Sequence, residues 1–248
     1  MNKIKQKNFE KYNELYYNPF EEKSFEVLSK TKIFKRIVNK NRITFHNKKI
    51  LEIGFGCGNL IPLIIKNGGL YYGIEISKSA IVTCRKKYGN KVDVNFVKSD
   101  KIDYNDEYFD ILIMSHSLEH IKNENKILKE VTRTLKKNDI LIIGVPSIGC
   151  RDNGLHFRIY NKKSLLEIFK KHSLKLTYYL EFREILLFYL FMKFFRKNKE
   201  YVKFSKNNRR VSLLEKIYYK IISPFFSNLY SMRISYGLIS EVWGVFKK

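Results

Sequence analysis

The sequence predicts an α/β fold, a mostly parallel sheet with helices on both faces, and the prediction starts from residues 49–75. A short apolar run at residues 50–53 precedes a glycine cluster, as a buried parallel strand does. Gly54, Gly56 and Gly58 then occupy every second position. Glycine adopts backbone angles that are closed to other residues and leaves no Cβ between the chain and a ligand. The stretch therefore predicts a strand that ends in a ligand-binding turn.

A helix and a second strand are expected next. Residues 59–66 have the pattern of a short helix, with Pro62 near its first turn and a glycine pair at 68–69 to end it. Residues 70–76 form an apolar strand that carries Glu75 near its carboxyl end. Strand, glycine turn, helix, strand and acid make a nucleotide-binding βαβ unit, in which the acid binds a ribose diol.

The spacing of the glycines indicates which nucleotide binds. A dinucleotide fingerprint, G-x-G-x-x-G, would need its third glycine at Asn59. A carboxylate at Glu52 would repel a pyrophosphate but tolerate a cationic ligand with a free amino group. The pattern E-x-G-x-G-x-G resembles motif I of the class I S-adenosylmethionine (SAM) dependent methyltransferases. A nicotinamide-binding fold and a glycine turn without a ligand are the alternatives.

The composition predicts a single α/β domain with appendages in a reducing compartment. The chain has 248 residues, and its three scattered cysteines, Cys57, Cys84 and Cys150, offer no disulfide framework. The amino terminus shows no apolar signal-peptide core, and no apolar run reaches the roughly 18 residues that a membrane span needs. The expected location is cytoplasmic, with peripheral contact at the inner face of the membrane as an option.

The formal net charge is +24. A charge of this size indicates an anionic partner, such as phospholipid head groups, a phosphate-linked substrate or RNA. A genome biased toward Lys, Asn, Ile, Tyr and Phe would produce the same excess. The charge by itself names no partner.

A third strand is expected after the nucleotide-binding unit. Ser77 is a candidate cap for a helix that runs to Tyr88, and residues 92–97 form a strand that leads to Asp100. In the methyltransferases that this sequence resembles, an acid at this place accepts a hydrogen bond from the adenine amino group. The next two residues, Lys101 and Ile102, would flank the ring. An aspartate that caps the turn after the strand is the alternative.

The segment after the fourth expected strand carries a more specific resemblance. The string F-D-I-L-I-M-S-H-S-L-E-H-I at residues 109–121 closely resembles the post-strand motif of a branch that includes the quinone O-methyltransferases and many sugar and small-molecule methyltransferases. Residues 129–143 resemble the branch's helix into strand five, with Asn138 and Asp139 in place of its usual glycine turn. Residues 154–160 resemble its loop before a helix, expected here over 163–172.

The resemblance covers about residues 45–182 and the last expected strand, 239–246. It implies a Rossmann-like sheet of seven strands, mostly parallel, and SAM as the cofactor. Carried over residue by residue, it implies these cofactor-binding residues: Glu52, Gly54, Phe55, Gly56, Cys57, Gly58, Asn59, Glu75, Ile76, Asp100, Lys101, Ile102 and Ser115.

Three histidines are candidate general bases. SAM carries its methyl group on a sulfonium, so the protein has to align the acceptor and take its proton, a task that suits histidine near neutral pH. His156 or His116 is the first choice and His120 the next, because all three follow strands whose carboxyl ends face the ligand. No metal is expected. If a helix begins after Ser115, His116, Glu119 and His120 would share one face and form the alternative metal set, similar to the acid, Glu and His of the quinone enzymes.

Two segments lie outside the expected core, which spans residues 45–182 and ends with the last strand at 237–248. Residues 1–44 are expected to be helical, and the resemblance implies a lid over the cofactor in which Tyr12, Tyr16 and Tyr17 contact ligand or simply pack. Residues 183–236 combine an apolar helix, a basic stretch and an amphipathic helix, which is typical of an interfacial or lid insertion. A plain helical cap and a dimer surface are the alternatives to membrane contact through 183–230.

The function expected from these features is transfer of a methyl group from SAM to a hydroxyl of a small-molecule, glycan or lipid-linked acceptor, with an amine or carboxylate as alternatives. An RNA methyltransferase is the second hypothesis, although no N-P-P-Y-like motif follows the fourth strand and no paired catalytic cysteines are present. A SAM-binding protein without turnover is a third. The sequence leaves the acceptor and the oligomeric state open, because insertions build the acceptor pockets of this fold.

Overall fold

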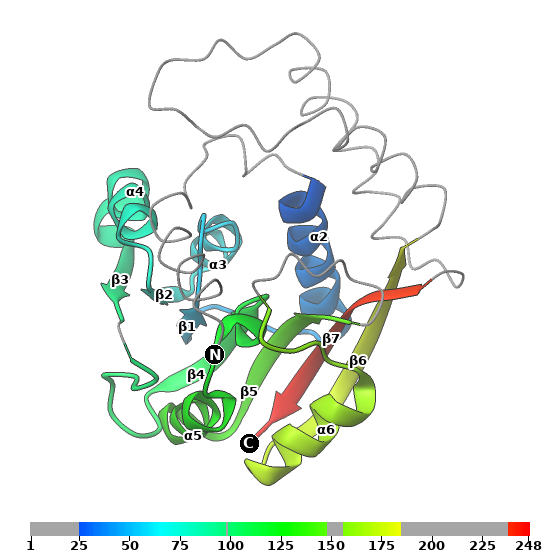
Figure 1. Ribbon diagram of the computed structural model, residues 1–248. Helices are drawn as coiled ribbons and strands as arrows, with labels where there is room; N and C mark the ends of the chain where they lie inside the picture. The colour runs from blue at the N-terminus through cyan, green and yellow to red at the C-terminus, as the bar shows by residue number, and fades with distance from the viewer. Residues whose placement is uncertain (1–24, 98, 148–155, 185–237) are drawn as a thin grey trace, which may run out of the picture.

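The computed structural model describes residues 25–97, 99–147, 156–184 and 238–248 (Figure 1). These ranges contain one sheet of seven strands and five α-helices. Expected features at residues 1–24, at Cys150, in the start of the 154–160 loop and in residues 185–236 of the insertion expected at 183–236 lie outside the described residues.

The sheet has the order β3-β2-β1-β4-β5-β7-β6. Neighbouring strands are parallel except at β7, which runs antiparallel to both β5 and β6. The prediction of a mostly parallel, seven-stranded sheet is therefore confirmed. The strand bounds are β1 (Lys49–Ile53), β2 (Leu70–Glu75), β3 (Val92–Phe96), β4 (Phe109–Ser115), β5 (Leu135–Pro146), β6 (Lys175–Glu184) and β7 (Leu238–Lys247).

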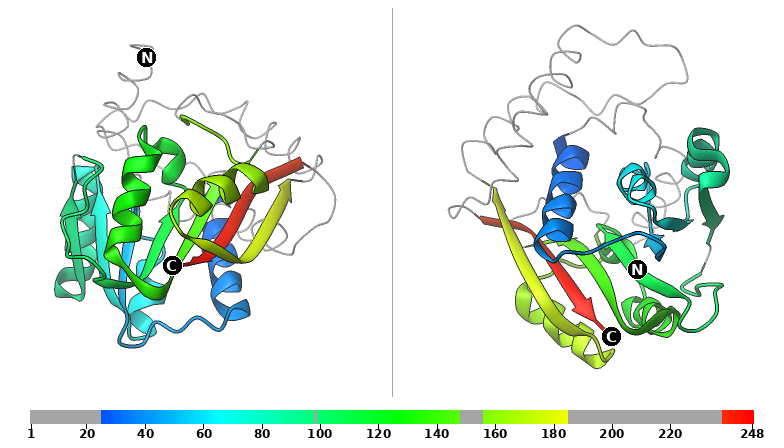
Figure 2. Two further views of the ribbon diagram at one scale, coloured as in Figure 1. Left: turned by 90° about the horizontal axis from the view of Figure 1, so that it is seen from below. Right: turned by 180° about the vertical axis from the view of Figure 1, so that it is seen from behind.

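Helices cover both faces of the sheet (Figure 2). One face packs against α2 (Phe25–Lys40), α3 (Ile61–Lys66) and α4 (Lys78–Tyr88), and the other against α5 (Glu124–Thr134) and α6 (Lys162–Lys171). Each face has its own cluster of buried apolar side chains, and successive side chains of a strand point to opposite faces. Ile50 therefore joins the first cluster and its neighbour Leu51 joins the second. Burial of the two clusters is the main stabilising contribution to this fold.

The described part of the amino-terminal segment is a helix of the core. In α2, Ile33, Phe34 and Ile37 are fully buried against the first face of the sheet. The basic side chains of the helix lie elsewhere on it, as expected for an amphipathic helix that covers a sheet. A lid role for residues 1–44 stays a prediction.

Local sequence signals explain where several elements begin. Ser77 caps α4 by accepting a hydrogen bond from the amide of Ala80, as predicted. Asn161 and Ser164 form a reciprocal capping box at the start of α6. Asn138 takes a φ of 66°, the left-handed conformation for which the related proteins use glycine.

The fifth strand begins earlier than predicted. Helix α5 ends at Thr134, and residues 135–137, which the resemblance assigned to the helix, already belong to β5. Leu135 pairs with Phe109 across the sheet and is fully buried there, so tertiary packing outweighs the helical propensity of this segment.

Candidate active site

The predicted site residues gather at one edge of the sheet, the edge formed by the carboxyl ends of β1, β2, β4 and β5. The chain reverses its strand order between β1 and β4, and ligands of open α/β sheets bind beside such a switch point. Strand β7 runs the opposite way, so its first residues lie at this same edge, where Glu241 pairs with Pro146 at the end of β5.

The glycine turn after β1 has the conformation that its sequence predicts. Gly54, Gly56 and Gly58 all take positive φ angles, between 51° and 74°. A Cβ on Gly54 would lie 2.7 Å from the Cβ of Ser117, so the turn passes directly against the loop after β4. Phe55 is buried and packs against Gly73, which leaves only its backbone to face a ligand. Half-buried Cys57 and Asn59 lie in the same turn.

Glu75 joins the end of β2 to the glycine turn. Its carboxylate accepts a hydrogen bond from the amide of Gly56 at 2.8 Å, and from the amides of Ile76 at 2.8 Å and Ser77 at 3.1 Å. These bonds fix the carboxylate beside the first glycines, where the ribose of a nucleotide lies in such units. The structure thus joins Glu75 to the glycine turn, and its binding of a ribose stays a prediction.

Glu52 lies beneath the turn and is almost completely buried. The hydroxyl of Tyr71 donates to its carboxylate at 2.7 Å. Burial raises the pKa of Glu52 to about 8, against the lowering effect of the Tyr71 hydrogen bond and with a further contribution from nearby Glu75. An uncharged carboxyl is thus the resting form near neutral pH, and a nearby cation would favour its ionised form.

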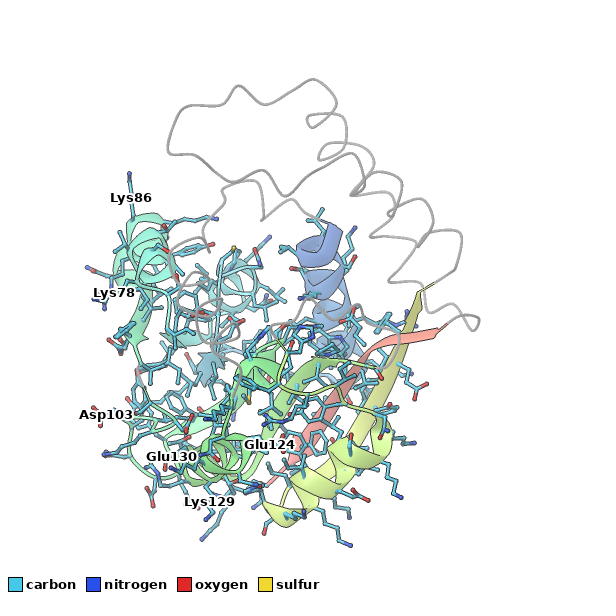
Figure 3. The ribbon with its side chains drawn as sticks, in the orientation of Figure 1. Lys78, Lys86, Asp103, Glu124, Lys129 and Glu130 are labelled. Carbon is cyan, nitrogen blue, oxygen red and sulfur yellow. The ribbon has the colours of Figure 1, made fainter. Side chains whose placement is uncertain are left out.

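The loop that follows β3 is held in place by hydrogen bonds from helix α5. Arg133 of α5 donates to the carbonyl oxygens of Ile102 and Tyr104, each within 2.8 Å, and to the carboxylates of Glu130 and Asp106. Glu130, labelled in Figure 3, also accepts from the amide of Ile102 at 2.9 Å. The segment after Asp100 is therefore tied to the body of the domain.

One residue of this loop differs from its prediction. Ile102 was expected beside the adenine ring, but its side chain is fully buried in the second core cluster. Asp100 is half-buried and Lys101 is exposed, so these two remain the loop residues that can reach a ligand. The side chain of Ile102 anchors the loop, because it is buried among the apolar side chains of this cluster.

His116 does not have the surroundings of a general base. Its Nε2 lies 2.7 Å from Oε2 of Glu241, and its Nδ1 lies 3.6 Å from Oε1 of Glu119. Burial and the charge of Lys30 on α2 oppose protonation, but the two carboxylates outweigh them and raise the pKa of His116. Despite burial, His116 in turn lowers the pKa values of Glu119 and Glu241. Both ring nitrogens of His116 face carboxylates, so the ring is poorly placed to take a proton from an acceptor, and this geometry disfavours His116 as the base.

The chain does not continue as a helix after β4. Ser115 is the half-buried last residue of the strand, and His116 takes a φ of 54°, which breaks the helical geometry before a short 3₁₀ helix at Leu118–His120. The helix on which the alternative metal set of His116, Glu119 and His120 depended is therefore absent from this described segment.

His120 and His156 face one another instead. Their ring centroids are 5.0 Å apart, and both rings are half-buried. Nε2 of His120 lies 3.9 Å from Oε1 of Glu119, and the backbone carbonyl of Glu119 accepts from the amide of Phe157 at 2.8 Å. The two histidines come from the loops after β4 and β5, at the predicted edge. As arranged, they can exchange protons with a ligand placed there.

Glu119, His120 and His156 also form a group with ligand atoms within 4.8 Å of one another. Such a donor set can in general bind a transition metal. Oε1 of Glu119 is directed at His116 and His120, while its Oε2 is buried without a hydrogen bond in the described structure.

Sequence reasoning missed Glu241 and Lys30. Glu241 is a buried acid in a mostly apolar last strand, and a charged residue in such a run is the signal that could have marked it. Trp243 donates its indole N–H to the same carboxylate oxygen at 2.8 Å. Lys30 offered no signal, because it is one of many lysines in a basic chain.

The fold and the site together define a class of protein: an α/β domain with a glycine turn, an acid at the end of the second strand and a set of histidines at the switch point. A family model described as "Methyltransferase domain" matches residues 51–143. Residues 51–143 therefore carry a class I SAM-dependent methyltransferase domain, and SAM is its cofactor.

Comparison with individual proteins agrees with this family. An uncharacterized protein of Methanocaldococcus jannaschii is 31% identical over 163 residues, which cover 65% of this chain and 71% of that protein. A ubiquinone biosynthesis O-methyltransferase of Pelagibacter ubique is 32% identical over 100 residues. The match covers 39% of this chain and 41% of that enzyme, so this chain spans less than half of the enzyme's length. A crystal structure of a SAM-dependent methyltransferase from Archaeoglobus fulgidus shares the fold at a TM-score of 0.56, with 21% identity over 88% of this chain and 94% of that one.

The structure also bears on membrane crossing. Within the described ranges, none of the helices combines the length and the apolar character that a bilayer span requires.

Proposed function

We propose that this methyltransferase moves the methyl group of SAM to an oxygen of a small-molecule, glycan or lipid-linked acceptor, and that His156 or His120 takes the acceptor's proton. We call the glycine turn with Glu52, Glu75 and Asp100 the cofactor side of the site. The group formed by Glu119, His120 and His156 is its acceptor side.

The observation that carries this proposal is that the two sides meet. Gly54 on the cofactor side lies directly against Ser117, two residues before Glu119. A cofactor held at the glycine turn therefore has the acceptor side as its neighbour. The short distance between the two sides favours direct transfer, since alignment of the reacting atoms supplies much of the rate enhancement of such reactions.

For this reaction the protein mainly has to hold SAM and the acceptor in the right relative positions. Bound SAM supplies a methyl group that is already activated by its sulfonium. The acceptor oxygen would form the new O–C bond as the S–CH₃ bond breaks and S-adenosylhomocysteine leaves, and the proton of the acceptor would pass to the unprotonated nitrogen of His156 or His120. Half-buried histidines with a carboxylate behind one of them suit this role, because the carboxylate stabilises the imidazolium that forms.

Cofactor binding is tested first. We expect isothermal titration calorimetry with S-adenosylhomocysteine to show binding at micromolar concentrations. A radiolabelled methyl group from SAM would then be followed into pools of quinols, glycans and lipid-linked sugars. Product analysis decides whether oxygen, nitrogen or carbon received the methyl group. No binding of S-adenosylhomocysteine by a folded sample would overturn the proposal.

The role of His156 is tested by His156→Gln, which keeps a polar side chain of similar length. We expect kcat to fall by about 10² to 10⁴-fold with the affinity for S-adenosylhomocysteine unchanged, because only proton transfer is lost. His172→Gln is the matched control, since His172 ends helix α6 and contacts Asn125 of helix α5, outside the site. A full rate in His156→Gln and a large loss in His120→Gln would assign the base to His120, and full rates in both would remove a histidine base.

RNA methylation is the second candidate, and the net charge of +24 favours it. Figure 3 shows the basic side chains Lys78 and Lys86 on α4 directed away from the body of the molecule. RNA binding that weakens steeply with salt, together with methyl transfer to RNA, would support it over a small acceptor.

Contact with a membrane surface through residues 183–230 is proposed from their sequence pattern, and sedimentation with anionic vesicles but not neutral ones tests it.

A further inference from the structure

The last strand of the sheet contributes an acid to the site that no sequence motif marks. Glu241 lies near the start of β7, and because β7 is antiparallel, this start reaches the edge where β4 and β5 end. Its carboxylate is buried and accepts two hydrogen bonds at the same oxygen, one from Trp243 at 2.8 Å and one with Nε2 of His116 at 2.7 Å. His116 and Trp243 also meet edge to face, with ring centroids 5.8 Å apart.

The contacts of His116 continue toward the acceptor side. Its Nδ1 faces Oε1 of Glu119 at 3.6 Å, and the same oxygen lies 3.9 Å from Nε2 of His120. The backbone of His116 is also held, since its amide donates to the carbonyl of Gly144 at 2.8 Å. A row of polar groups, with buried acids and half-buried histidines, thus runs from Glu241 through His116 and Glu119 to His120.

We propose that Glu241 is a positioning residue: through His116 it holds Glu119, and with it His120 and His156, in the arrangement that methyl transfer uses. The proposal rests on the proposed function of the two histidines. Glu241 touches neither of them and acts through the His116 ring, whose two nitrogens join two carboxylates from distant parts of the chain.

The charged groups around His116 stabilise this row of polar side chains. Glu119 and Glu241 are the acids that contact the ring, and Lys30 of α2 is the cation that acts on it. A charged hydrogen bond is shorter and stronger than a neutral one, and removing one partner of a buried pair leaves the other uncompensated. Loss of the Glu241 charge therefore releases His116, and Glu119 loses the contact that directs its Oε1.

The experiment measures the histidine rings directly, so it needs no acceptor. Ring nitrogen and carbon-bound proton signals of the five histidines are recorded at pH 7.5 by long-range proton–nitrogen NMR, with assignment by single His→Gln variants. In the unchanged protein we expect His116 to show both nitrogens protonated. In Glu241→Gln we expect this signature to disappear, and the ring signals of His120 and His156 to shift as well. His46 and His172 should not move.

The control is Glu107→Gln, an exposed acid before the start of β4, at the far end of the strand. It should leave all histidine signals in place. Where Glu241→Gln fails to fold, His116→Gln interrupts the same row from its middle and should shift His120 and His156 alike. Once an acceptor is known, Glu241→Gln should lower kcat by about tenfold or more with KM for SAM unchanged.

Two results would overturn the proposal. One is a folded Glu241→Gln in which His116 keeps both protons, and the other is loss of the His116 signature with His120 and His156 unmoved. Calorimetry with S-adenosylhomocysteine on the same samples keeps the questions apart. A protein that binds no S-adenosylhomocysteine removes the proposed function, whereas unmoved His120 and His156 signals remove only the positioning role.

Discussion

The cofactor side and the acceptor side of this protein are built from contacts of different range in the chain. Glu75 and the amide of Gly56 that it accepts from are 19 residues apart, and Tyr71 and Glu52 are equally close. On the acceptor side, His116 and Glu241 are 125 residues apart. A single βαβ unit thus forms most of the cofactor side, whereas the acceptor side exists only when β4, β5 and β7 have come together. This difference predicts that cofactor binding and acceptor chemistry can be damaged separately.

The largest effect is expected for Glu75→Ala. The substitution removes the acceptor of three backbone amides and the carboxylate predicted to bind the ribose, so binding of S-adenosylhomocysteine should weaken by about 100-fold or more. Isothermal titration calorimetry measures the affinity for S-adenosylhomocysteine in both proteins. Asp93→Ala, which removes a neighbouring exposed acid on β3, is the control and should bind normally. Unchanged affinity in folded Glu75→Ala would contradict the assignment of the cofactor side.

Gly54→Ala tests the contact between the two sides. The new methyl group would meet the Cβ of Ser117 at 2.7 Å in a residue with a φ of 74°, so overpacking and backbone strain add together. We expect a loss of about 2 kcal/mol or more in the free energy of unfolding. Gly89→Ala is the matched control, since Gly89 also has a positive φ but nothing within 4 Å of an added Cβ, and it should lose less. Denaturant unfolding compares the two, and equal losses would show that the contact with Ser117 is unimportant.

Glu52→Gln tests the buried acid of the cofactor side through pH. Glu52 has its pKa raised from 4.5 to about 8, so the folded protein binds its proton more tightly than the unfolded chain does. The stability that this proton supplies is complete below about pH 4.5 and is lost as the pH rises through about 8. The variant stays neutral, so its free energy of unfolding relative to the unchanged protein should increase between pH 6 and pH 9, by on the order of 1 kcal/mol or more.

Thermal unfolding at several pH values measures this difference, and the other titrating groups cancel in the comparison. A stability difference that is independent of pH would show that Glu52 is not buried as a neutral acid. The same variant should bind SAM more weakly, because a neutral amide cannot balance the charge of a cationic ligand.

The smallest effect is expected for Arg133→Lys. A lysine keeps the charge but loses the planar fork that binds Glu130, Asp106 and the carbonyl oxygens of the loop after β3. Looser anchoring of Asp100 should weaken binding of S-adenosylhomocysteine by about fivefold while the histidine NMR signals stay unchanged. Arg36→Lys, on the outer face of α2, is the control. A shift of the His120 and His156 signals in Arg133→Lys would mean that the two sides are coupled more closely than their contacts indicate.

Much of the cofactor side could be predicted from the sequence because its signals are local. The glycine spacing, the acids at the strand ends and the cap at Ser77 each depend on neighbours in the chain, and the structure contains the turn, the carboxylate bonds and the cap. The failures come where a residue's surroundings are set from afar. The side chain of Ile102 is buried in the core, and its carbonyl oxygen accepts a hydrogen bond from Arg133 of helix α5. No local sequence pattern predicts that contact.

The order of residues was enough to predict a mostly parallel α/β sheet with a ligand-binding glycine turn, because periodicity, glycine conformation and acid spacing are properties of short segments. The state of His116, in contrast, is set by folding. Its two carboxylate partners come from a loop and from the far end of the chain, and the antiparallel direction of β7 brings Glu241 to the right edge of the sheet. The charge of a buried histidine depends on its three-dimensional neighbours, and these come together only in the folded protein.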